Sequence, residues 1–416
     1  MAEWSKTQLS DILVDKGYIR GPFGSALKRG DMKENGVPVY EQQHAIYDSR
    51  GFRYYIDEQK FVEMKRFQVN TDDLIISCSG TVGKVSIIRD DDPKGIISQA
   101  LLLLRVDKNK ILPLYLKYFF SSRDGYNAIV SRSSGSVQVN IAKRDVIEQI
   151  PLMLPKIETQ RKIVGVLNSI DKKIDENERI NKNLEQQAQA IFKEWFIDNP
   201  ENNEWSTGTF SELIKSTLNG DWGKEAPTGN NTEKVYCIRG ADIPEVKAGN
   251  KGKMPTRYIL SKNFATKQLA AGDIVVEISG GSPTQSTGRC TAITQSLLDR
   301  YDSGMVCTNF CKAMKPKEGY SLFIYYYWQY LYGKGVFFSY ENGTTGIKNL
   351  DFSGFIETET ILIPPVDKVI AFDDYCKSIF NQIFANGKQN EHLAILRDTL
   401  LPKLMSGELD VSDIDL

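Results

Sequence analysis

The stretch IVGVLNSIDKKIDENERINKNLEQQAQAIFKEW, residues 163–195, contains the pattern that decides the fold of this chain. Its apolar residues recur at alternating spacings of four and three, from Ile163 to Trp195, and no proline interrupts them. This heptad spacing predicts one long helix whose apolar stripe packs against a partner helix. A single stripe would fit a core helix equally well, so the partner has to be found elsewhere in the chain.

A second stripe with the same spacing lies in FDDYCKSIFNQIFANGKQNEHLAILRDTLLPKL, residues 372–404. Every member of this stripe follows its counterpart by 209 positions, and both stripes are interrupted by an Asn-Asn pair in the same heptad positions. Such a match indicates an internal duplication. The two predicted helices have about forty residues each and a length of about 60 Å, and each is the obvious partner of the other.

The order of the parts along the chain predicts how the two helices pair. A sequence of globule, helix, globule and helix is connected most simply when the second helix runs back along the first, so we expect an antiparallel pair. Asn177 and Asn181 should then face Asn386 and Asn390. Buried Asn at core positions fixes the register of a helix pair at some expense of stability.

The duplication continues through the globular parts. EWSKTQLSDI from Glu3 recurs as EWSTGTFSEL from Glu204, and the turn GPFG at 21–24 recurs as GDWG at 220–223. DDLIISCSGTVGKVSII from Asp72 and AGDIVVEISGGSPTQSTGRCTAI from Ala271 each predict a strand, a glycine-serine loop and a second strand. We therefore expect an α+β protein with two globular α/β domains, joined by two long antiparallel coiled-coil helices in a pseudo-two-fold internal repeat.

Proline-terminated apolar runs set the expected domain limits, because each globular part closes on one, at Pro155 and at Pro365. The first globular domain comprises residues 1–155 and the second 198–365. The long helices comprise residues 156–197 and 366–405, and an acidic tail follows at 406–416.

Composition restricts the functional class. The chain has 416 residues and a net charge of −1, so any contact with nucleic acid has to come from local patches. No apolar run is long enough to span a bilayer, and the first residues lack the pattern of a signal peptide, which favours a cytoplasmic protein with no membrane contact. Six cysteines without C-x-x-C spacing and only two histidines make a zinc site hard to assemble.

The segment SGTVGKV from Ser79 resembles the end of a phosphate-binding loop. Cys78 stands where that loop needs a glycine, however, and Val85 stands where it needs Ser or Thr. Two interpretations remain: a loop that lies against a nucleic-acid backbone through Lys84 and backbone N–H groups, or a plain hairpin turn. No Ser/His/acid or metal-nuclease pattern accompanies it, so we expect neither catalytic nor metal-binding residues.

An aromatic run, LFIYYYWQYLYG from Leu322, has two interpretations as well. It could be a stacking platform for single-stranded nucleic acid. Its helical period, and its match in position to LPLYLKYFF in the first half, favour a buried core helix.

Two non-identical globular domains, each followed by a long heptad helix, resemble the specificity subunit of type I restriction-modification systems. The resemblance covers nearly the whole chain. It is carried by GPFGS from Gly21, VPVYEQQHAI from Val37, SGTVGKV from Ser79, the long stretch that starts LPKIETQRK at Leu154, and LLPKLMSGEL from Leu400, with weaker matches in GDWG and IRGADI.

The resemblance implies a non-catalytic subunit with two target-recognition domains, residues 1–155 and 198–365, that each read one half of an asymmetric, split sequence in double-stranded DNA. It implies that the two helices set the spacer and bind two methyltransferase subunits, and that restriction and translocase subunits join the complex. AdoMet, ATP and Mg²⁺ are then expected only in the partner subunits, so this chain needs no cofactor.

Polar residues in the loops that recur in both domains are the candidates for DNA contact, since Arg and Lys suit guanine whereas Asn and Gln suit adenine. In the first domain they are Gln42, Gln43, His44, Ser79, Thr81, Lys84, Ser133, Ser136, Gln138 and Asn140. In the second domain they are Arg239, Ser282, Thr284, Gln285, Arg289, Asn342, Thr344 and Lys348.

Two other functions compete with this interpretation. A two-headed protein–protein adaptor without DNA readout would use the same rigid arrangement, although polar, glycine-rich loops suit a grooved anionic ligand better than an apolar interface. A fused restriction-methylation enzyme would need methyltransferase and nuclease motifs, which this sequence lacks.

Overall fold

The computed structural model describes residues 4–133, 139–282, 284–343 and 347–414. The chain divides into two compact units. Unit 1 consists of residues 1–172 and 394–416, and unit 2 consists of residues 173–393. Each unit therefore contains one globular part and a section of both long helices.

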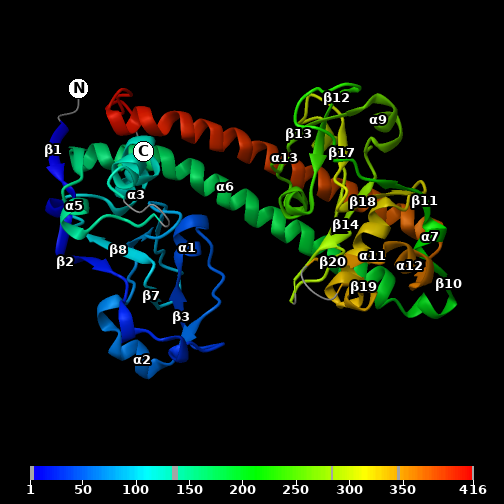
Figure 1. Cartoon of the computed structure of the whole chain (residues 1–416), viewed down its shortest axis with the longest axis horizontal. Helices are drawn as coiled ribbons and strands as arrows, with labels where there is room; N and C mark the ends of the chain where they lie inside the picture. Colours follow the sequence, from blue (N-terminus) through cyan, green and yellow to red (C-terminus); the bar gives the residue numbers. More distant parts are fainter. Residues whose placement is uncertain (1–3, 134–138, 283, 344–346, 415–416) are drawn as a thin grey trace. The chain divides into compact units, whose positions relative to one another are not determined.

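Unit 1 is built on three small sheets (Figure 1). β1 and β9 pair antiparallel, β2, β8, β5 and β6 form an antiparallel sheet in that order, and β3 lies between antiparallel β4 and parallel β7. The strands are β1 (Trp4–Gln8), β2 (Leu13–Arg20), β3 (Val37–Tyr40), β4 (Tyr55–Ile56), β5 (Leu74–Ser77), β6 (Val85–Ile87), β7 (Ile96–Ile97), β8 (Leu101–Val106) and β9 (Pro151–Pro155).

The core of unit 1 lies where the four-stranded sheet meets its helices. Alternate residues of β8 point to two different apolar clusters, as the two-residue period of a strand requires: Leu102 and Leu104 to one, Leu101 and Leu103 to the other. The α-helices of the described part of unit 1 are α1 (Gln42–Tyr47), α2 (Glu58–Glu63), α3 (Pro113–Ser121), α4 (Arg123–Val130), α5 (Arg144–Glu148), the first part of α6 (Ile157–Phe192) and the last part of α13 (Val366–Ser406).

Among the described residues, unit 2 repeats the sheets of unit 1 and adds one more, of order β15-β20-β19. β10 pairs with β21, the four-stranded sheet has the order β11-β18-β14-β16, and β12 lies between antiparallel β13 and parallel β17. The strands are β10 (Ser206–Thr209), β11 (Ile214–Asn219), β12 (Asn231–Ile238), β13 (Thr256–Leu260), β14 (Ile274–Glu277), β15 (Ser279–Gly280), β16 (Cys290–Ala292), β17 (Met305–Cys307), β18 (Cys311–Pro316), β19 (Glu341–Asn342), β20 (Lys348–Leu350) and β21 (Thr360–Ile363).

This shared topology confirms the predicted internal repeat. An ion pair is repeated with it: Asp73 binds Arg105 at 2.7 Å in unit 1, and Asp273 binds Lys315 at 2.9 Å in unit 2. Each carboxylate directly precedes an inner strand of the four-stranded sheet, β5 or β14, and accepts a hydrogen bond from the backbone N–H three residues earlier, that of Asn70 or Ala270. The two units therefore share a buried carboxylate with a basic partner in addition to the arrangement of their strands.

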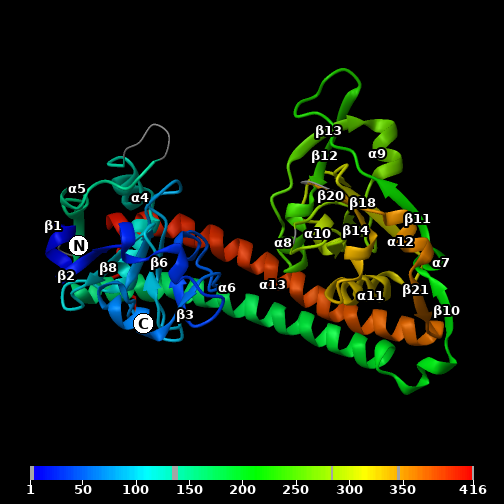
Figure 2. The same ribbon diagram turned by 60° about the horizontal axis from the view of Figure 1, so that its bottom comes forward.

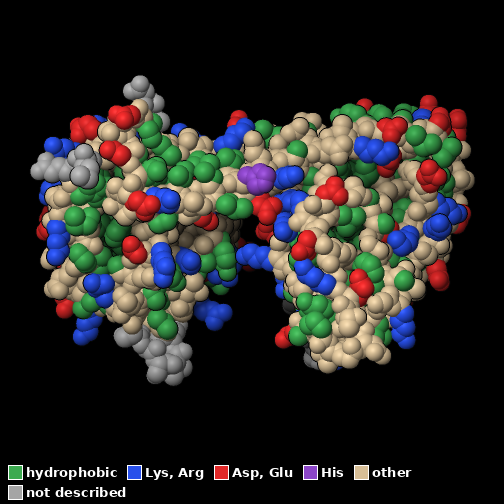
Figure 3. Space-filling view, turned by 90° about the horizontal axis from the view of Figure 1, so that it is seen from above, with side chains coloured by type: hydrophobic (Ala, Val, Ile, Leu, Met, Phe, Trp, Pro, Cys, Tyr) green, Lys and Arg blue, Asp and Glu red, His purple; other side chains and the backbone are tan. Residues whose placement is uncertain are grey.

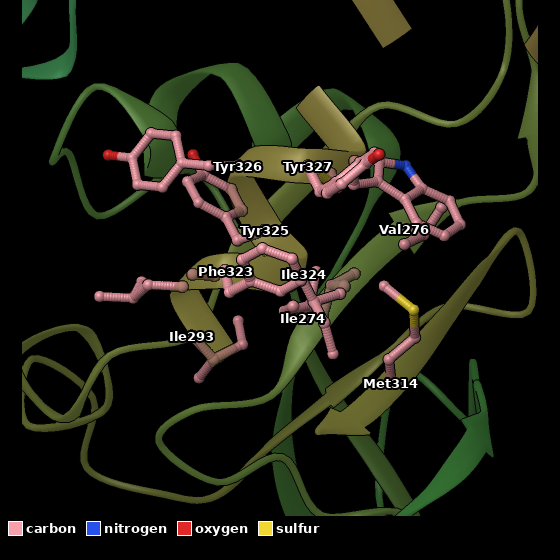
Figure 4. Close-up of a cluster of buried hydrophobic side chains, with 14 of the residues drawn as sticks. Ile274, Val276, Ile293, Met314, Phe323, Ile324, Tyr325, Tyr326 and Tyr327 are labelled. Atoms are coloured by element: carbon pink, nitrogen blue, oxygen red, sulfur yellow. The ribbon is translucent and has the colours of Figure 1, made fainter. Parts of the chain in front are cut away.

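The aromatic run of the second half forms α11 (Ser321–Gly333), and most of its side chains are buried, which confirms the core-helix interpretation. Figure 4 shows Phe323 and Ile324 of this helix close to Ile274 of β14. In Figure 2, α11 lies against α13 (Val366–Ser406), where the rings of Tyr326 and Phe372 are 5.6 Å apart. The other helices of unit 2 are α7 (Phe210–Leu213), α8 (Ile243–Lys247), α9 (Ser261–Lys267), α10 (Gln295–Leu298) and α12 (Phe352–Thr358).

The two heptad stretches form α6 and α13, and within each unit these helices pack antiparallel. In unit 2, Asn177 Nδ2 donates to Asn390 Oδ1 at 2.8 Å, and Asn386 Nδ2 donates to Asn181 Oδ1 at 2.8 Å. In unit 1, Arg397 binds Asp171 at 3.0 Å in the same register. The predicted antiparallel pairing and the predicted facing of the Asn layers are both confirmed.

The helix bounds differ little from those expected. α6 ends at Phe192 and continues as a π-helical turn, Lys193–Ile197, and α13 ends at Ser406. Residues 1–155 and 198–365 as self-contained recognition domains stay a prediction, because the compact units also include the adjoining helix sections.

Candidate nucleic-acid interface

Several loops of unit 1 meet at one end of its four-stranded sheet, where β2 and β5 finish and β8 begins. Gly21 N donates to Leu101 O and Cys78 N donates to Ala100 O, both at 2.9 Å, so the turns after β2 and β5 lie side by side. We call this surface loop end 1, defined by residues 21–24, 42–43, 78–84 and 139–141.

Long-range hydrogen bonds hold loop end 1 together. The side chain of Gln42 accepts hydrogen bonds from Cys78 N at 3.1 Å and from Ser79 N at 2.9 Å. Ser79 also forms an isolated β-bridge with Asn140, beside a 2.8 Å hydrogen bond from Gly80 N to Val139 O. Three loops that the sequence marked separately are thereby brought into one surface.

The loop from Ser79 to Lys84 is the turn of a hairpin, since β5 and β6 pair antiparallel on either side of it. Lys84 N donates to Ser77 Oγ at 3.0 Å and Gly83 N donates to Ser77 O at 2.9 Å, which closes the turn. A phosphate-binding loop of the Walker type needs a helix after it, so this interpretation is excluded. Thr81 and Lys84 are exposed on the turn, and Lys84 Nζ lies 4.7 Å from the centroid of the Tyr126 ring.

Other predicted residues of unit 1 are engaged in contacts within the unit. His44 is fully buried, its ring stacks on Phe52 at 4.6 Å between centroids, and burial lowers its pKa. Gln43 Nε2 donates to Gly51 O at 3.1 Å, and Ser133 Oγ donates to Ile129 O at 3.0 Å.

Of the remaining candidates of unit 1, Asn140 is exposed in loop end 1, whereas Ser136 and Gln138 lie outside the described residues.

Unit 2 presents the equivalent surface, at the end of its four-stranded sheet where β18 begins. Asp221 N donates to Cys307 O at 2.8 Å, Ile278 N donates to Phe310 O at 2.9 Å, and Leu350 N donates to Ile278 O at 2.8 Å. We call this surface loop end 2, defined by the described residues of 220–223, 239–242, 278–289, 308–310 and 341–350. The pairing of Ser279 with Asn349 in β15 and β20 corresponds to the bridge between Ser79 and Asn140.

Each basic candidate of loop end 2 is held by a carboxylate. Arg239 donates to both oxygens of Asp242 at 2.8 and 3.0 Å, and Arg289 donates to both oxygens of Glu277 at 2.8 and 2.7 Å. Lys348 binds Glu341 at 2.7 Å. Hydrogen bonding to these carboxylates raises the pKa of Arg239 and of Arg289, so both guanidinium groups stay charged. Such paired side chains have a fixed orientation.

The remaining candidates of loop end 2 are uncharged. Ser282 Oγ accepts a hydrogen bond from Gln285 N at 3.1 Å and shapes the turn from which Thr284 and Gln285 are exposed. Asn342 is exposed on β19. Thr344 lies outside the described residues.

The loop ends also expose apolar side chains that were not candidates from the sequence, among them Phe23 and Trp222. These two occupy the same position in the turns GPFG and GDWG. The repeated turn was visible in the sequence, but the exposure of its aromatic residue was not.

Charge is mixed rather than segregated on the surface. Figure 3 shows Lys and Arg interspersed with Asp and Glu on the face in view, in agreement with a net charge of −1. Within the described ranges, no three His, Cys, Asp or Glu side chains are grouped as metal ligands, and no helix has the length and apolar character needed to cross a bilayer.

The chain is similar to proteins of one family. Residues 1–186 match the model of the type I restriction modification DNA specificity domain. The MjaIX type I restriction enzyme specificity subunit of Methanocaldococcus jannaschii is 26% identical over 387 residues, which cover 89% of this chain and 84% of that protein. The HindI type I restriction enzyme specificity subunit of Haemophilus influenzae is 30% identical over 118 residues, 28% of this chain and 26% of that protein.

A solved structure shares the fold. The crystal structure of the S subunit of a type I restriction-modification system from M. genitalium matches with a TM-score of 0.55 and 15% sequence identity. The match covers 97% of this chain and 96% of that one, so the fold is shared over both units.

Proposed function

Because this chain belongs to the specificity subunits of type I restriction-modification systems, we propose that each of its units reads one half of an asymmetric, bipartite DNA sequence. The observation that carries the proposal is the pair of loop ends. The two units share one strand topology, yet the loops on the repeated frame differ in sequence and in charge. Two half-sites of different sequence are expected from such a pair.

The side chains available on the loop ends suit base readout. Asn140 and Lys84 are exposed at loop end 1, and Gln285 and Asn342 at loop end 2. Asn and Gln can make paired hydrogen bonds to adenine, and Lys and Arg can bind guanine O6 and N7. Arg239 and Arg289 are already oriented by Asp242 and Glu277, which favours a guanidinium aimed at one base edge.

Gln42 and His44 have a different role in this proposal. Gln42 fixes the position of the turn after β5 through its hydrogen bonds to Cys78 N and Ser79 N. His44 fills the core beside Phe52. Both would therefore position the readers of DNA rather than contact a base.

We further propose that α6 and α13 set the spacing between the half-sites and dock two methyltransferase subunits, with restriction and translocase subunits joining the complex. Apolar side chains exposed on α13, among them Val366, Ile370, Ile395 and Leu396, support a protein partner at these helices. This chain would then contribute no catalytic group, and AdoMet, ATP and Mg²⁺ would serve the partner subunits.

Mapping the methylated sequences in cells that carry this chain with its methyltransferase subunit tests the proposal. We expect two different half-sites separated by a fixed gap. Variants Lys84→Ala and Asn140→Ala should relax only the half-site read by unit 1, whereas Gln285→Ala and Asn342→Ala should relax only the other. An unbroken palindrome, or variants at both loop ends that leave the methylated sequence unchanged, would contradict the proposal and favour an adaptor without DNA readout.

A further inference from the structure

An exposed aromatic side chain stands at the same position of both loop ends. The turn GPFG follows β2 with Phe23 as its third residue, and the turn GDWG follows β11 with Trp222 as its third residue. The Phe23 side chain is 59% exposed and that of Trp222 is 37% exposed. Single exposed apolar residues are common on proteins. These two are notable because they lie at equivalent positions of the internal repeat.

The two turns share the conformation of their last glycine and the close packing of their first. The last glycine has a φ of +62° at Gly24 and of +59° at Gly223, in the left-handed region. A Cβ on the first glycine would lie 1.9 Å from Ser98 O at Gly21 and 1.8 Å from Thr308 O at Gly220. Each turn therefore places its aromatic residue two positions after a glycine packed against backbone and directly before a glycine in the left-handed conformation.

An arginine accompanies each ring, but the two arginines come from different elements. The guanidinium carbon of Arg20, at the end of β2, lies 5.7 Å from the centroid of the Phe23 ring. The guanidinium carbon of Arg257, on β13, lies 3.6 Å from the centroid of the Trp222 ring. These arginines are not counterparts in the duplication. Each unit therefore pairs its exposed ring with an arginine from a different strand, β2 in unit 1 and β13 in unit 2.

Neither ring is needed for the core of its unit. Phe23 and Trp222 belong to none of the buried apolar clusters of the described residues. Both turns lie in the loop ends, because Gly21 N donates to Leu101 O beside the turn after β5, and Asp221 N donates to Cys307 O beside the start of β18. The rings therefore lie on the same surfaces as the proposed readers of DNA.

We propose that Phe23 and Trp222 each make an apolar contact between their unit and its half-site, with the ring packed on a thymine methyl group or deoxyribose. The adjacent arginine, half-buried at Arg20 and buried at Arg257, supports the ring from within the unit. Apolar side chains read the thymine methyl group in the major groove, and a guanidinium group against an aromatic ring stabilises the position of that ring. The inference rests on the proposed function and adds to it a pair of residues outside the polar readers.

Binding measurements on the complex of this chain with its methyltransferase subunits test the inference. The probe is a labelled duplex that contains both mapped half-sites, and the dissociation constant is measured by fluorescence anisotropy at several salt concentrations. We expect Phe23→Ala and Trp222→Ala each to weaken binding on the order of tenfold, near the low end of the loss found when a ring stacked on a single-stranded base is removed. Phe23→Trp and Trp222→Phe should stay within about threefold of the parent.

Two controls separate this contact from a structural role. Val62 on α2 is 70% exposed and lies outside loop end 1, so Val62→Ala should bind as the parent does. The salt dependence should be unchanged in Phe23→Ala, because an apolar contact releases no counterions. A changed salt slope, or a loss of binding accompanied by a lower unfolding temperature, would overturn the proposed contact.

The outcome also separates this inference from the function on which it rests. If Phe23→Ala and Trp222→Ala bind as the parent while Lys84→Ala and Gln285→Ala are weakened, the aromatic contact is refuted and DNA reading by the loop ends stands. If none of the four variants is weakened, the proposed function itself is refuted.

Discussion

Gly387, near the middle of α13, allows a close approach that a larger residue would prevent. A Cβ at this position would lie 1.9 Å from Gly249 O and 2.6 Å from Gly249 C, both backbone atoms of unit 2. The loop at 248–250 that approaches α13 is also bound by α6, since Asn181 Nδ2 donates to Ala248 O at 3.1 Å. We therefore expect Gly387→Ala to destabilise unit 2.

The magnitude follows from two opposed effects. Alanine in place of glycine inside a helix stabilises by about 1 kcal/mol. The Cβ, however, needs more than 3.0 Å to the carbonyl oxygen, so the loop has to move by roughly 1 Å. That shift weakens the hydrogen bonds from Asn181 to Ala248 O and from Arg300 Nη1 to Gly249 O, which together contribute about 3 kcal/mol. The net loss in free energy of unfolding should be about 2 kcal/mol.

Urea unfolding followed by circular dichroism measures this loss, and Gly333→Ala is the matched control. Gly333 is the last residue of α11, and a Cβ there would have no atom within 4 Å. The control should be as stable as the parent or up to about 1 kcal/mol more stable. If Gly387→Ala is as stable as the control, the close approach of the loop to α13 is not a constraint and the reasoning fails.

Three further predictions concern buried polar groups. Asn181→Leu should lower the free energy of unfolding by about 2 kcal/mol, since Asn386 Nδ2 loses its acceptor in a buried position, and urea unfolding should detect this. Asp73→Asn should cost about 2 kcal/mol by the same measurement, because Asp73 is buried and accepts two hydrogen bonds from Arg105; a cost near zero would mean that the repeated ion pair is not structural. All six cysteines are buried, and burial raises the pKa of the Cys78 thiol to about 12. A disulfide reagent at pH 8 should therefore label no thiol of the native chain and all six thiols after unfolding. Rapid labelling of the native chain would contradict this prediction.

The sequence predicted the frame well because its signals are periodic and occur twice. Two heptad stripes in one register predict a helix pair, and the Asn layers predict which positions face each other. Asn177 and Asn390 are indeed hydrogen-bonded, as are Asn181 and Asn386. A stripe of this kind depends only on helical geometry and apolar burial, and both can be read from local spacing.

The site was predicted only as a set of loops. Gln42 and His44 have the polar character of base readers, yet one hydrogen-bonds to the backbone 36 and 37 positions away and the other is buried against Phe52. Conversely, the turns GPFG and GDWG were recognised as repeats, while the exposure of Phe23 and Trp222 could not be. Local sequence determines whether a segment turns, but not which of its side chains meets protein.

By itself, then, the sequence determined the duplication, the pairing of α6 with α13 and the loops that vary between the copies. Only the tertiary structure decided that those loops converge at one end of each four-stranded sheet, that Arg239 and Arg289 are paired with carboxylates, and that an aromatic ring stands exposed in each turn. The physical reason is the separation, along the sequence, of the residues that make each contact. Helix pairing follows from a pattern repeated every few residues, whereas convergence, ion pairing and exposure depend on contacts between segments that lie far apart in the chain.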